Sequence, residues 1–338
     1  MRDSRLIVAG VAGFILLAGS CAEPAIAQSA PETTGPYKVV MEMDPSLPEH
    51  TVYRPEQVSR VKGKLPVVAY GNGACANAGN AFENYLAEVA SYGFLVVANG
   101  PINPAAPGRP PKPGQSFPPF PGPPKGETGP AAGSGRPPFQ QSKTTQLYET
   151  MDWAKVQNAT DGSPYKGKLD LASIAVMGQS CGGLQALEAA GDLRVKTAVI
   201  LNSGIIRNAV PLPEGESPAK GAPMCVPVAG LVLPGSPETL KKLHTPVIYV
   251  IGGESDIAFK NAEQDFSEIE AVPVFKANMD TGHNGTYWQP HGGKFAEVAT
   301  EWVLWQLKGD KKAGAMFTGE ECGLCTAPEW KVARKNWK

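Results

Sequence analysis

The sequence predicts an α/β protein with a mostly parallel central sheet and helices on both of its faces. From Lys64 onward, short apolar runs of strand length alternate with segments in which apolar residues recur at helical spacing. Continuous apolar strands separated by helices are typical of a parallel sheet that is buried on both sides. The expected strands cover 65–70, 94–98, 173–178, 197–202, 246–252 and 272–279. The expected helices begin near Phe82 and near Cys181, and cover 144–157, 260–270 and 293–308.

The remaining organisation favours one domain over 28–338. Segments 37–43 and 50–55 fit an antiparallel hairpin ahead of the sheet, and no internal repeat of fixed period is visible. Residues 101–139 contain fourteen prolines and seven glycines, which exclude a helix or an inner strand. We expect a solvated insertion there, with a lid as the alternative, and a small cap is an option for 205–237.

The N-terminus has the pattern of an export signal over 1–27. A basic start is followed by an apolar stretch over 6–17 and an A-x-A cleavage site at 25–27. The apolar stretch is too short to cross a bilayer, so a stable membrane span is not expected. We therefore predict a secreted or periplasmic protein, with a lipoprotein acylated at Cys21, or a membrane anchor, as less favoured alternatives.

Composition excludes one class of partner. Lys and Arg total 31 and Asp and Glu total 32, a formal net charge of -1. Binding to nucleic acid phosphates needs a basic surface, so nucleic acid is not an expected partner. No pattern in the sequence predicts a cofactor, and none predicts an oligomeric state.

Cysteine pairing is the default for an exported protein. Cleavage after Ala27 leaves five cysteines, which allow at most two bridges. The sequence alone does not choose among the pairings. In the C-terminal tail, 309–338, Cys322 and Cys325 have the spacing of a metal half-site, but no second pair has zinc spacing. We expect a local disulfide or another structural role for them, and no metal site.

The segment "VMGQSCGG" places two potential nucleophiles side by side. The expected strand, turn and helix around Gly178 to Gly182 match the G-x-S-x-G nucleophile elbow. Residues two before and two after the apex must be very small, because they pass close to its backbone. If the turn is centred on Ser180, both of these residues are glycine. If it is centred on Cys181, one of them is Gln179. Ser180 is therefore the expected nucleophile.

A serine hydroxyl needs a base, and the base needs an orienting carboxylate. In this architecture the chain order is Ser, then Asp or Glu, then His. His283 follows the expected strand 272–279 in the loop "DTGHNG" and is the preferred base, with His291 in reserve. Asp256 follows the strand 246–252 and is the preferred acid. The alternatives for the acid are Glu254 and Asp280.

An oxyanion hole needs two backbone amides aimed at the developing negative charge. The residue after the nucleophile, Cys181, supplies one of them. The second is expected from the glycine-rich turn after the strand 65–70. Asn72 is the preferred donor there, followed by Gly73 or Ala74.

The motifs "AYGNGACA", "VMGQSCGG", "IGGESDIA" and "TGHNGTYW" together resemble those of secreted α/β-hydrolases. The closest resemblance is to the branch that contains dienelactone hydrolases, cutinase-like enzymes and polyester hydrolases. This resemblance implies the α/β-hydrolase fold and hydrolysis of carboxylic esters, small or polymeric, through an acyl-enzyme. By the same resemblance Ser180 is the nucleophile, Asp256 the acid and His283 the base, and Asn72 and Cys181 provide the oxyanion amides.

The chain departs from that branch at three places. Cys181 stands where those enzymes have Met, Asn72 stands where they have an aromatic residue, and they lack the insertion at 101–139. An aromatic polyester is therefore a disfavoured substrate. In the α/β-hydrolase strand order Cys75 and Cys181 would follow adjacent strands, so we hypothesise a disulfide between them.

Alternative functions remain open from the sequence. The same triad also acts on lactones, peptides and carbon–carbon bonds, and a non-catalytic binding protein can keep the same fold. Tyr287 and Trp288 follow the expected base closely. They either line an acyl pocket or pack under the final helix, and packing is the favoured interpretation.

Overall fold

A ten-stranded, mostly parallel sheet forms the centre of the molecule. The computed structural model describes residues 27–103, 141–207 and 234–337. The strands lie in the order β1-β2-β3-β5-β4-β6-β7-β8-β9-β10. They are β1 (Gln28–Ser29), β2 (Val39–Glu42), β3 (His50–Pro55), β4 (Leu65–Gly71), β5 (Leu95–Asn99), β6 (Leu169–Gln179), β7 (Val195–Leu201), β8 (Val247–Ile251), β9 (Val274–Asn278) and β10 (Lys331–Lys335). The α/β class predicted from the sequence is therefore confirmed.

The six strands from β4 to β9 run parallel, and the outer strands run antiparallel to their neighbours. β5, β4, β6, β7, β8 and β9 pair side by side in parallel register. β2 and β3 form the expected hairpin, whose second strand pairs antiparallel with β5. All carboxyl ends of the parallel strands thus meet at one edge of the sheet, which is where ligands bind in such folds.

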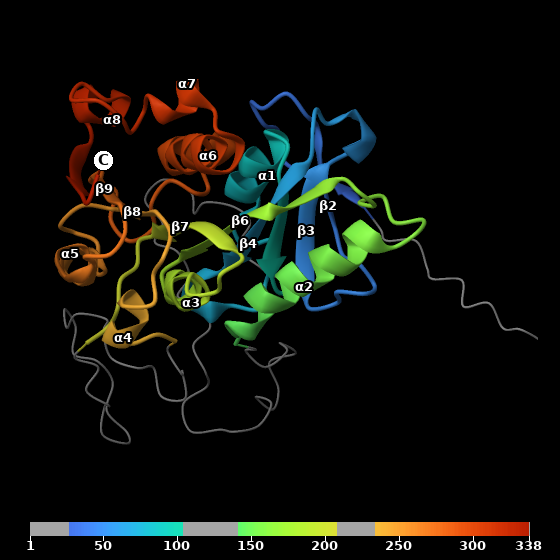
Figure 1. Cartoon of the computed structure of the whole chain (residues 1–338), viewed down its shortest axis with the longest axis horizontal. Helices are drawn as coiled ribbons and strands as arrows, with labels where there is room; N and C mark the ends of the chain where they lie inside the picture. Colours follow the sequence, from blue (N-terminus) through green and yellow to red (C-terminus); the bar gives the residue numbers. More distant parts are fainter. Residues whose placement is uncertain (1–26, 104–140, 208–233, 338) are drawn as a thin grey trace, which may run out of the picture.

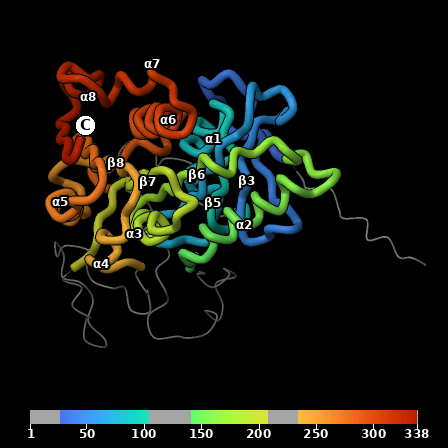
Figure 2. The backbone as a smooth tube through the Cα atoms, viewed as in Figure 1, coloured from blue at the N-terminus to red at the C-terminus, as the bar shows by residue number. Residues whose placement is uncertain are grey.

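Helices cover both faces of the sheet, as the apolar strands predict (Figure 1). The helices are α1 (Glu83–Ser91), α2 (Thr145–Ala159), α3 (Cys181–Ala189), α4 (Pro237–Leu240), α5 (Phe259–Glu268), α6 (Gly293–Lys308), α7 (Lys311–Gly314) and α8 (Gly323–Thr326). α1 and α6 pack against each other on one face, and α2 and α3 lie on the other (Figure 2).

Strand β4 shows why the sheet is buried on both sides. All seven of its residues are buried, and alternate side chains enter different layers. Val67 and Ala69 belong to the core beneath α2 and α3, and Val68 and Tyr70 to the core beneath α1 and α6. Successive side chains of a strand point to opposite faces of the sheet. Because the residues facing both sides are apolar, both faces of β4 are buried.

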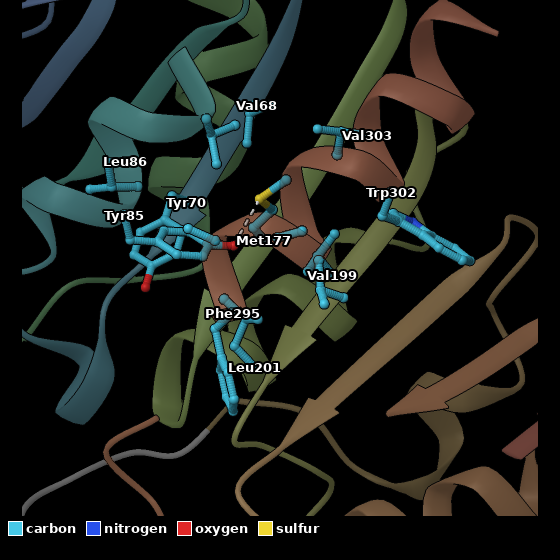
Figure 3. Close-up of a cluster of buried hydrophobic side chains, with 14 of the residues drawn as sticks. Val68, Tyr70, Tyr85, Leu86, Met177, Val199, Leu201, Phe295, Trp302 and Val303 are labelled. Atoms are coloured by element: carbon cyan, nitrogen blue, oxygen red, sulfur yellow. Dashed lines mark hydrogen bonds between the residues drawn. The ribbon is translucent and has the colours of Figure 1, made fainter. Parts of the chain in front are cut away.

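Aromatic side chains fill the core beneath α1 and α6 (Figure 3). The hydroxyl group of Tyr85, on α1, lies 3.6 Å from the sulfur of Met177, on β6. The ring of Trp302, on α6, is fully buried, and its indole N–H donates to the hydroxyl of Thr197 on β7. These contacts fix the helical layer against the strands that lead into the candidate site.

The elements expected from the sequence end with the helix over 293–308, but regular structure continues beyond it. The tail continues through α7 and α8 into β10, which pairs antiparallel with β9 and closes the edge of the sheet. Trp337, just beyond β10, contacts the rings of Phe275, Trp302 and Trp305. Cys322 and Cys325 form the expected local disulfide within this tail.

Several predicted features lie outside the described residues. These are most of the expected signal peptide over 1–27, with Cys21, and most of the insertion over 101–139 and of the cap over 205–237, with Cys225. Among the described helices, none is both long enough and apolar enough to cross a membrane.

Candidate active site

Ser180 lies at a sharp turn between β6 and α3. Its backbone has φ 54° and ψ −118°, a conformation that L-residues with a side chain rarely adopt. Its amide donates a 2.9 Å hydrogen bond to the carbonyl of Leu201, at the end of the adjacent strand β7. Strained backbone of this kind clusters at functional sites, and here it places the hydroxyl at the carboxyl edge of the sheet.

The two glycines of the motif are required by the packing of this turn. A Cβ on Gly178 would overlap the carbonyl of Gly182, and a Cβ on Gly182 would overlap the carbonyl of Gly71. Both collisions are with backbone, which cannot move aside as a flexible side chain can. The turn therefore admits no larger residue at either position, as the choice of Ser180 over Cys181 assumes.

His283 lies beyond β9 and reaches the serine over the sheet edge. Its Nε2 atom is 2.9 Å from Oγ of Ser180, and its Nδ1 atom is 2.7 Å from Oδ1 of Asp256. The His283 side chain is 22% exposed, so it can meet a molecule from solvent. The three residues chosen from sequence as nucleophile, base and acid thus form one continuous hydrogen-bonded chain.

Asp256 is held as a buried carboxylate. It is 3% exposed and accepts hydrogen bonds from the backbone amides of Gly252 and Ala258 at 3.0 and 2.9 Å. Burial opposes the charge, but the hydrogen bond from His283 and these amides outweigh it, so the pKa of Asp256 lies below its ordinary value. The acid is therefore ionised at neutral pH.

The ionised carboxylate determines where the protons lie. A carboxylate only accepts, so Nδ1 of His283 carries the proton and donates to Asp256. In the neutral ring Nε2 is then an acceptor, and the Ser180 hydroxyl donates to it. This arrangement can draw a proton from Ser180 as its oxygen attacks an electrophile.

The reserve candidates lie elsewhere. The Nδ1 atom of His291 lies 3.0 Å from the carbonyl oxygen of Glu32, which belongs to the N-terminal segment. Glu254 is exposed, and Asp280, also exposed, accepts a hydrogen bond from the hydroxyl of Ser255. Within the described part of the chain, none of the three forms a hydrogen bond or ion pair with His283.

The turn after β4 lies against the first turn of α3. A Cβ on Gly182 would be 2.7 Å from the amide nitrogen of Asn72, which places that amide beside the start of the helix. Within the described residues, no acceptor takes a hydrogen bond from the amide of Asn72 or from that of Cys181. Neither preferred oxyanion amide is therefore engaged by a described group, although both residues are buried, with Asn72 0% and Cys181 4% exposed.

A disulfide joins Cys75 to Cys181, as hypothesised from the sequence. Their Cα atoms are 5.1 Å apart. Two residues of the turn, Ala74 at φ 53° and Cys75 at φ 49°, adopt the left-handed conformation that favours glycine. The bridge ties this unusual turn to the residue that follows Ser180.

Sequence patterns do not single out two amide side chains of the site. Asn202 follows β7 and donates from Nδ2 to Oδ2 of Asp256 at 2.6 Å. Gln179 precedes Ser180 and donates from Nε2 to the carbonyl of His283 at 3.1 Å. Their only sequence signal is position, since each stands where a parallel strand ends.

Tyr287 packs under α6, the helix observed over the expected 293–308 segment. It is fully buried, and its ring contacts Phe295 of α6 and Tyr85 of α1. The favoured interpretation of Tyr287 is thus confirmed. Trp288 is also buried, and its indole N–H donates to the carbonyl of Ala81.

Fold and site together define an α/β protein with a serine–histidine–aspartate chain at the carboxyl edge of a parallel sheet. In the described part of the chain, no group of three or more His, Cys, Asp or Glu side chains could hold a metal ion. The sequence matches no model of a known protein family and no curated protein.

Proposed function

We propose that this chain is a serine hydrolase that cleaves carboxylic esters through an acyl-enzyme. The carrying observation is the alignment of Ser180, His283 and Asp256, joined by hydrogen bonds of 2.9 and 2.7 Å. The strained turn beneath Ser180 supports the same chemistry, and so do the backbone amides of Asn72 and Cys181, which donate to no described acceptor.

In the first half of the proposed reaction, Oγ of Ser180 attacks the ester carbonyl and Nε2 of His283 takes its proton. Asp256 stabilises the imidazolium that results. The amides of Asn72 and Cys181 hold the negative oxygen of the tetrahedral intermediate, and one such donor typically contributes about 10²- to 10³-fold in rate. His283 then protonates the departing alcohol, which leaves the acyl group on Ser180.

In the second half, His283 takes a proton from water while the water oxygen attacks the acyl carbonyl. The same two amides stabilise the second tetrahedral intermediate. Collapse of this intermediate returns the proton to Ser180 and releases the carboxylic acid. Because the His283 side chain is 22% exposed, water can reach it once the alcohol has left.

We further propose that the fold is that of an α/β-hydrolase. The nucleophile follows β6, the acid follows β8 and the base follows β9, which is the chain order expected of that fold. The neighbouring positions of β4 and β6 agree with it as well. The resemblance to secreted dienelactone hydrolases and cutinase-like enzymes rests on the same elements.

Export from the cytoplasm belongs to the same proposal. Cys75–Cys181 and Cys322–Cys325 are both paired as disulfides. Structural disulfides persist in oxidising compartments and are rare in reducing ones. The two disulfides therefore agree with the export signal expected at the N-terminus. We propose on both grounds that the enzyme is secreted or periplasmic.

A fluorophosphonate probe tests the proposal directly, because it labels only an activated serine. We expect labelling of the wild type and none of Ser180→Ala, with p-nitrophenyl esters of increasing chain length then sizing the acyl pocket. A wild type that stays unlabelled and hydrolyses none of these esters would favour a binding protein. Labelling without ester hydrolysis would point instead to another acyl substrate.

A further inference from the structure

A buried asparagine behind the acid has no role in the reaction described above. Asn202 directly follows β7 and is 0% exposed. Its φ of 43° is left-handed, and its amide donates to the carbonyl of Val250 at 2.9 Å. Asn is tolerated in this conformation better than most residues, and the conformation turns its side chain into the site.

The side-chain amide of Asn202 holds two parts of the site at once. Its Nδ2 atom lies 2.6 Å from Oδ2 of Asp256 and 3.2 Å from the carbonyl of Gly282, the residue before His283. The first is a charge-assisted hydrogen bond and is therefore stronger than a neutral one. One amide group thus connects the acid to the loop that carries the base.

Tyr287 determines which way this amide points. The Tyr287 hydroxyl is fully buried and donates to Oδ1 of Asn202. The reversed amide would place its oxygen against the carboxylate of Asp256 and the carbonyl of Gly282, so that three acceptors would face one another. The orientation with Nδ2 toward Asp256 is therefore the one that the surroundings allow.

We propose that Asn202 is a positioning residue for Asp256, and that Tyr287 acts through it by fixing the amide. This proposal rests on the proposed hydrolase function. The two oxygens of Asp256 divide their partners: Oδ1 faces His283 and Ala258, and Oδ2 faces Asn202 and Gly252. Without Asn202 the second oxygen keeps only a backbone donor, and the carboxylate can rotate away from His283.

Replacement of Asn202 by leucine tests the role. Leucine has a similar size and no donor. We expect kcat on a p-nitrophenyl ester to fall about 10- to 100-fold, as for loss of a hydrogen bond to a charged group. KM should stay within about twofold, because Asn202 is buried and does not meet substrate. The matched control is Thr245→Val, which removes a buried hydroxyl that donates to Lys196 near the opposite ends of β7 and β8.

A shape-preserving variant separates hydrogen bonding from packing. Asn202→Asp keeps the volume but replaces the donor with an acceptor. Two adjacent carboxylates cannot both ionise easily, and a shared proton restores a donor. We expect kcat relative to wild type to rise as the pH is lowered. A ratio that does not change with pH would contradict the assigned role.

A double-mutant cycle tests whether Tyr287 acts through Asn202. We expect Tyr287→Phe to lower kcat about three- to tenfold in the wild type and by no further factor in Asn202→Leu. Tyr165→Phe is its control, since the Tyr165 hydroxyl is also buried but bonds to Glu42 away from the site. Equal effects of Tyr287→Phe in both backgrounds would refute action through Asn202.

Proton NMR provides a readout that needs no turnover. The proton between Nδ1 of His283 and Asp256 gives a far-downfield resonance, assigned by its loss in His283→Gln. We expect it in the wild type and in Thr245→Val, and its loss or broadening in Asn202→Leu. If it persists and kcat matches Thr245→Val, the proposal is wrong. If the wild type shows the resonance but is neither labelled by the probe nor active on esters, the proposed hydrolase function is wrong. The positioning of Asp256 by Asn202 can then still be judged from the resonance.

Discussion

The sulfur atoms of Cys75 and Cys181 join the turn after β4 to the residue that follows Ser180. This bridge connects the two backbone segments that carry the proposed oxyanion amides. It closes a long loop, since 106 positions separate the two cysteines in sequence. Its loss should therefore affect both the stability of the fold and the reaction.

The double variant Cys75→Ala/Cys181→Ala removes the bridge without leaving a free thiol. In the chain-entropy description, a loop of this length contributes about 4–5 kcal/mol to the free energy of unfolding. Ala74 should then leave its left-handed conformation, which displaces the amide of Asn72 and lowers kcat at least about tenfold. Urea unfolding and p-nitrophenyl ester turnover measure the two effects.

The second disulfide provides the matched control for that variant. Cys322 and Cys325 are three positions apart, so Cys322→Ala/Cys325→Ala should cost about 2 kcal/mol or less. We expect kcat to be unchanged in this control. Equal loss of kcat in both double variants would show that the Cys75–Cys181 bridge has no particular role at the site.

Gly182→Ala should abolish activity and destabilise the protein, because its Cβ would overlap the carbonyl of Gly71. The matched control is Gly191→Ala, two residues beyond α3, where the nearest side-chain atom is 3.4 Å away. We expect the control to keep wild-type probe labelling and melting temperature. Normal labelling of Gly182→Ala would contradict the close approach of α3 to the turn after β4.

The central strands, and the residues of the Ser180–His283–Asp256 hydrogen-bonded chain, were predictable because their signals are local. β4, β5, β7, β8 and β9 are short apolar runs, and burial on both faces leaves a continuous pattern in the sequence. Ser180 is marked by its flanking glycines, and Asp256 and His283 by their places after strands. Chain order narrows the choice but leaves Glu254 and Asp280 as alternatives for the acid and His291 as the alternative for the base.

The remaining features were not predictable because their causes are tertiary. β10 reads "KVARK", a mostly basic segment whose strand conformation depends on the free edge of β9. Asn202 looks like any polar residue after a strand until Asp256 and Tyr287 are brought beside it. Gln179 is likewise defined only by the loop of His283 that packs over it.

Gln179→Met should slow the reaction modestly. The side chain of Gln179 donates to the carbonyl of His283, and methionine keeps the length without the donor. We expect kcat to fall about three- to tenfold, the range for one neutral hydrogen bond, with little change in KM. Gln146→Met is the control, because the buried Gln146 amide bonds to the carbonyl of Glu49 instead. If both variants have the same kcat, Gln179 does not position the base.

Asp256→Asn tests the charge of the acid in two ways. The value of kcat should fall about 10⁴-fold, as in serine proteases with the same change.

The same variant tests the contribution of the charge to stability. The pKa of Asp256 is lower in the folded protein than the ordinary 3.8. The stability from its charge is therefore complete above that value and is lost as pH falls through the folded pKa. The difference in unfolding free energy between wild type and Asp256→Asn should shrink as the pH falls below 3.8 and through the lower folded pKa. Urea unfolding at each pH measures this difference. A constant difference would mean that the carboxylate gains nothing from its partners.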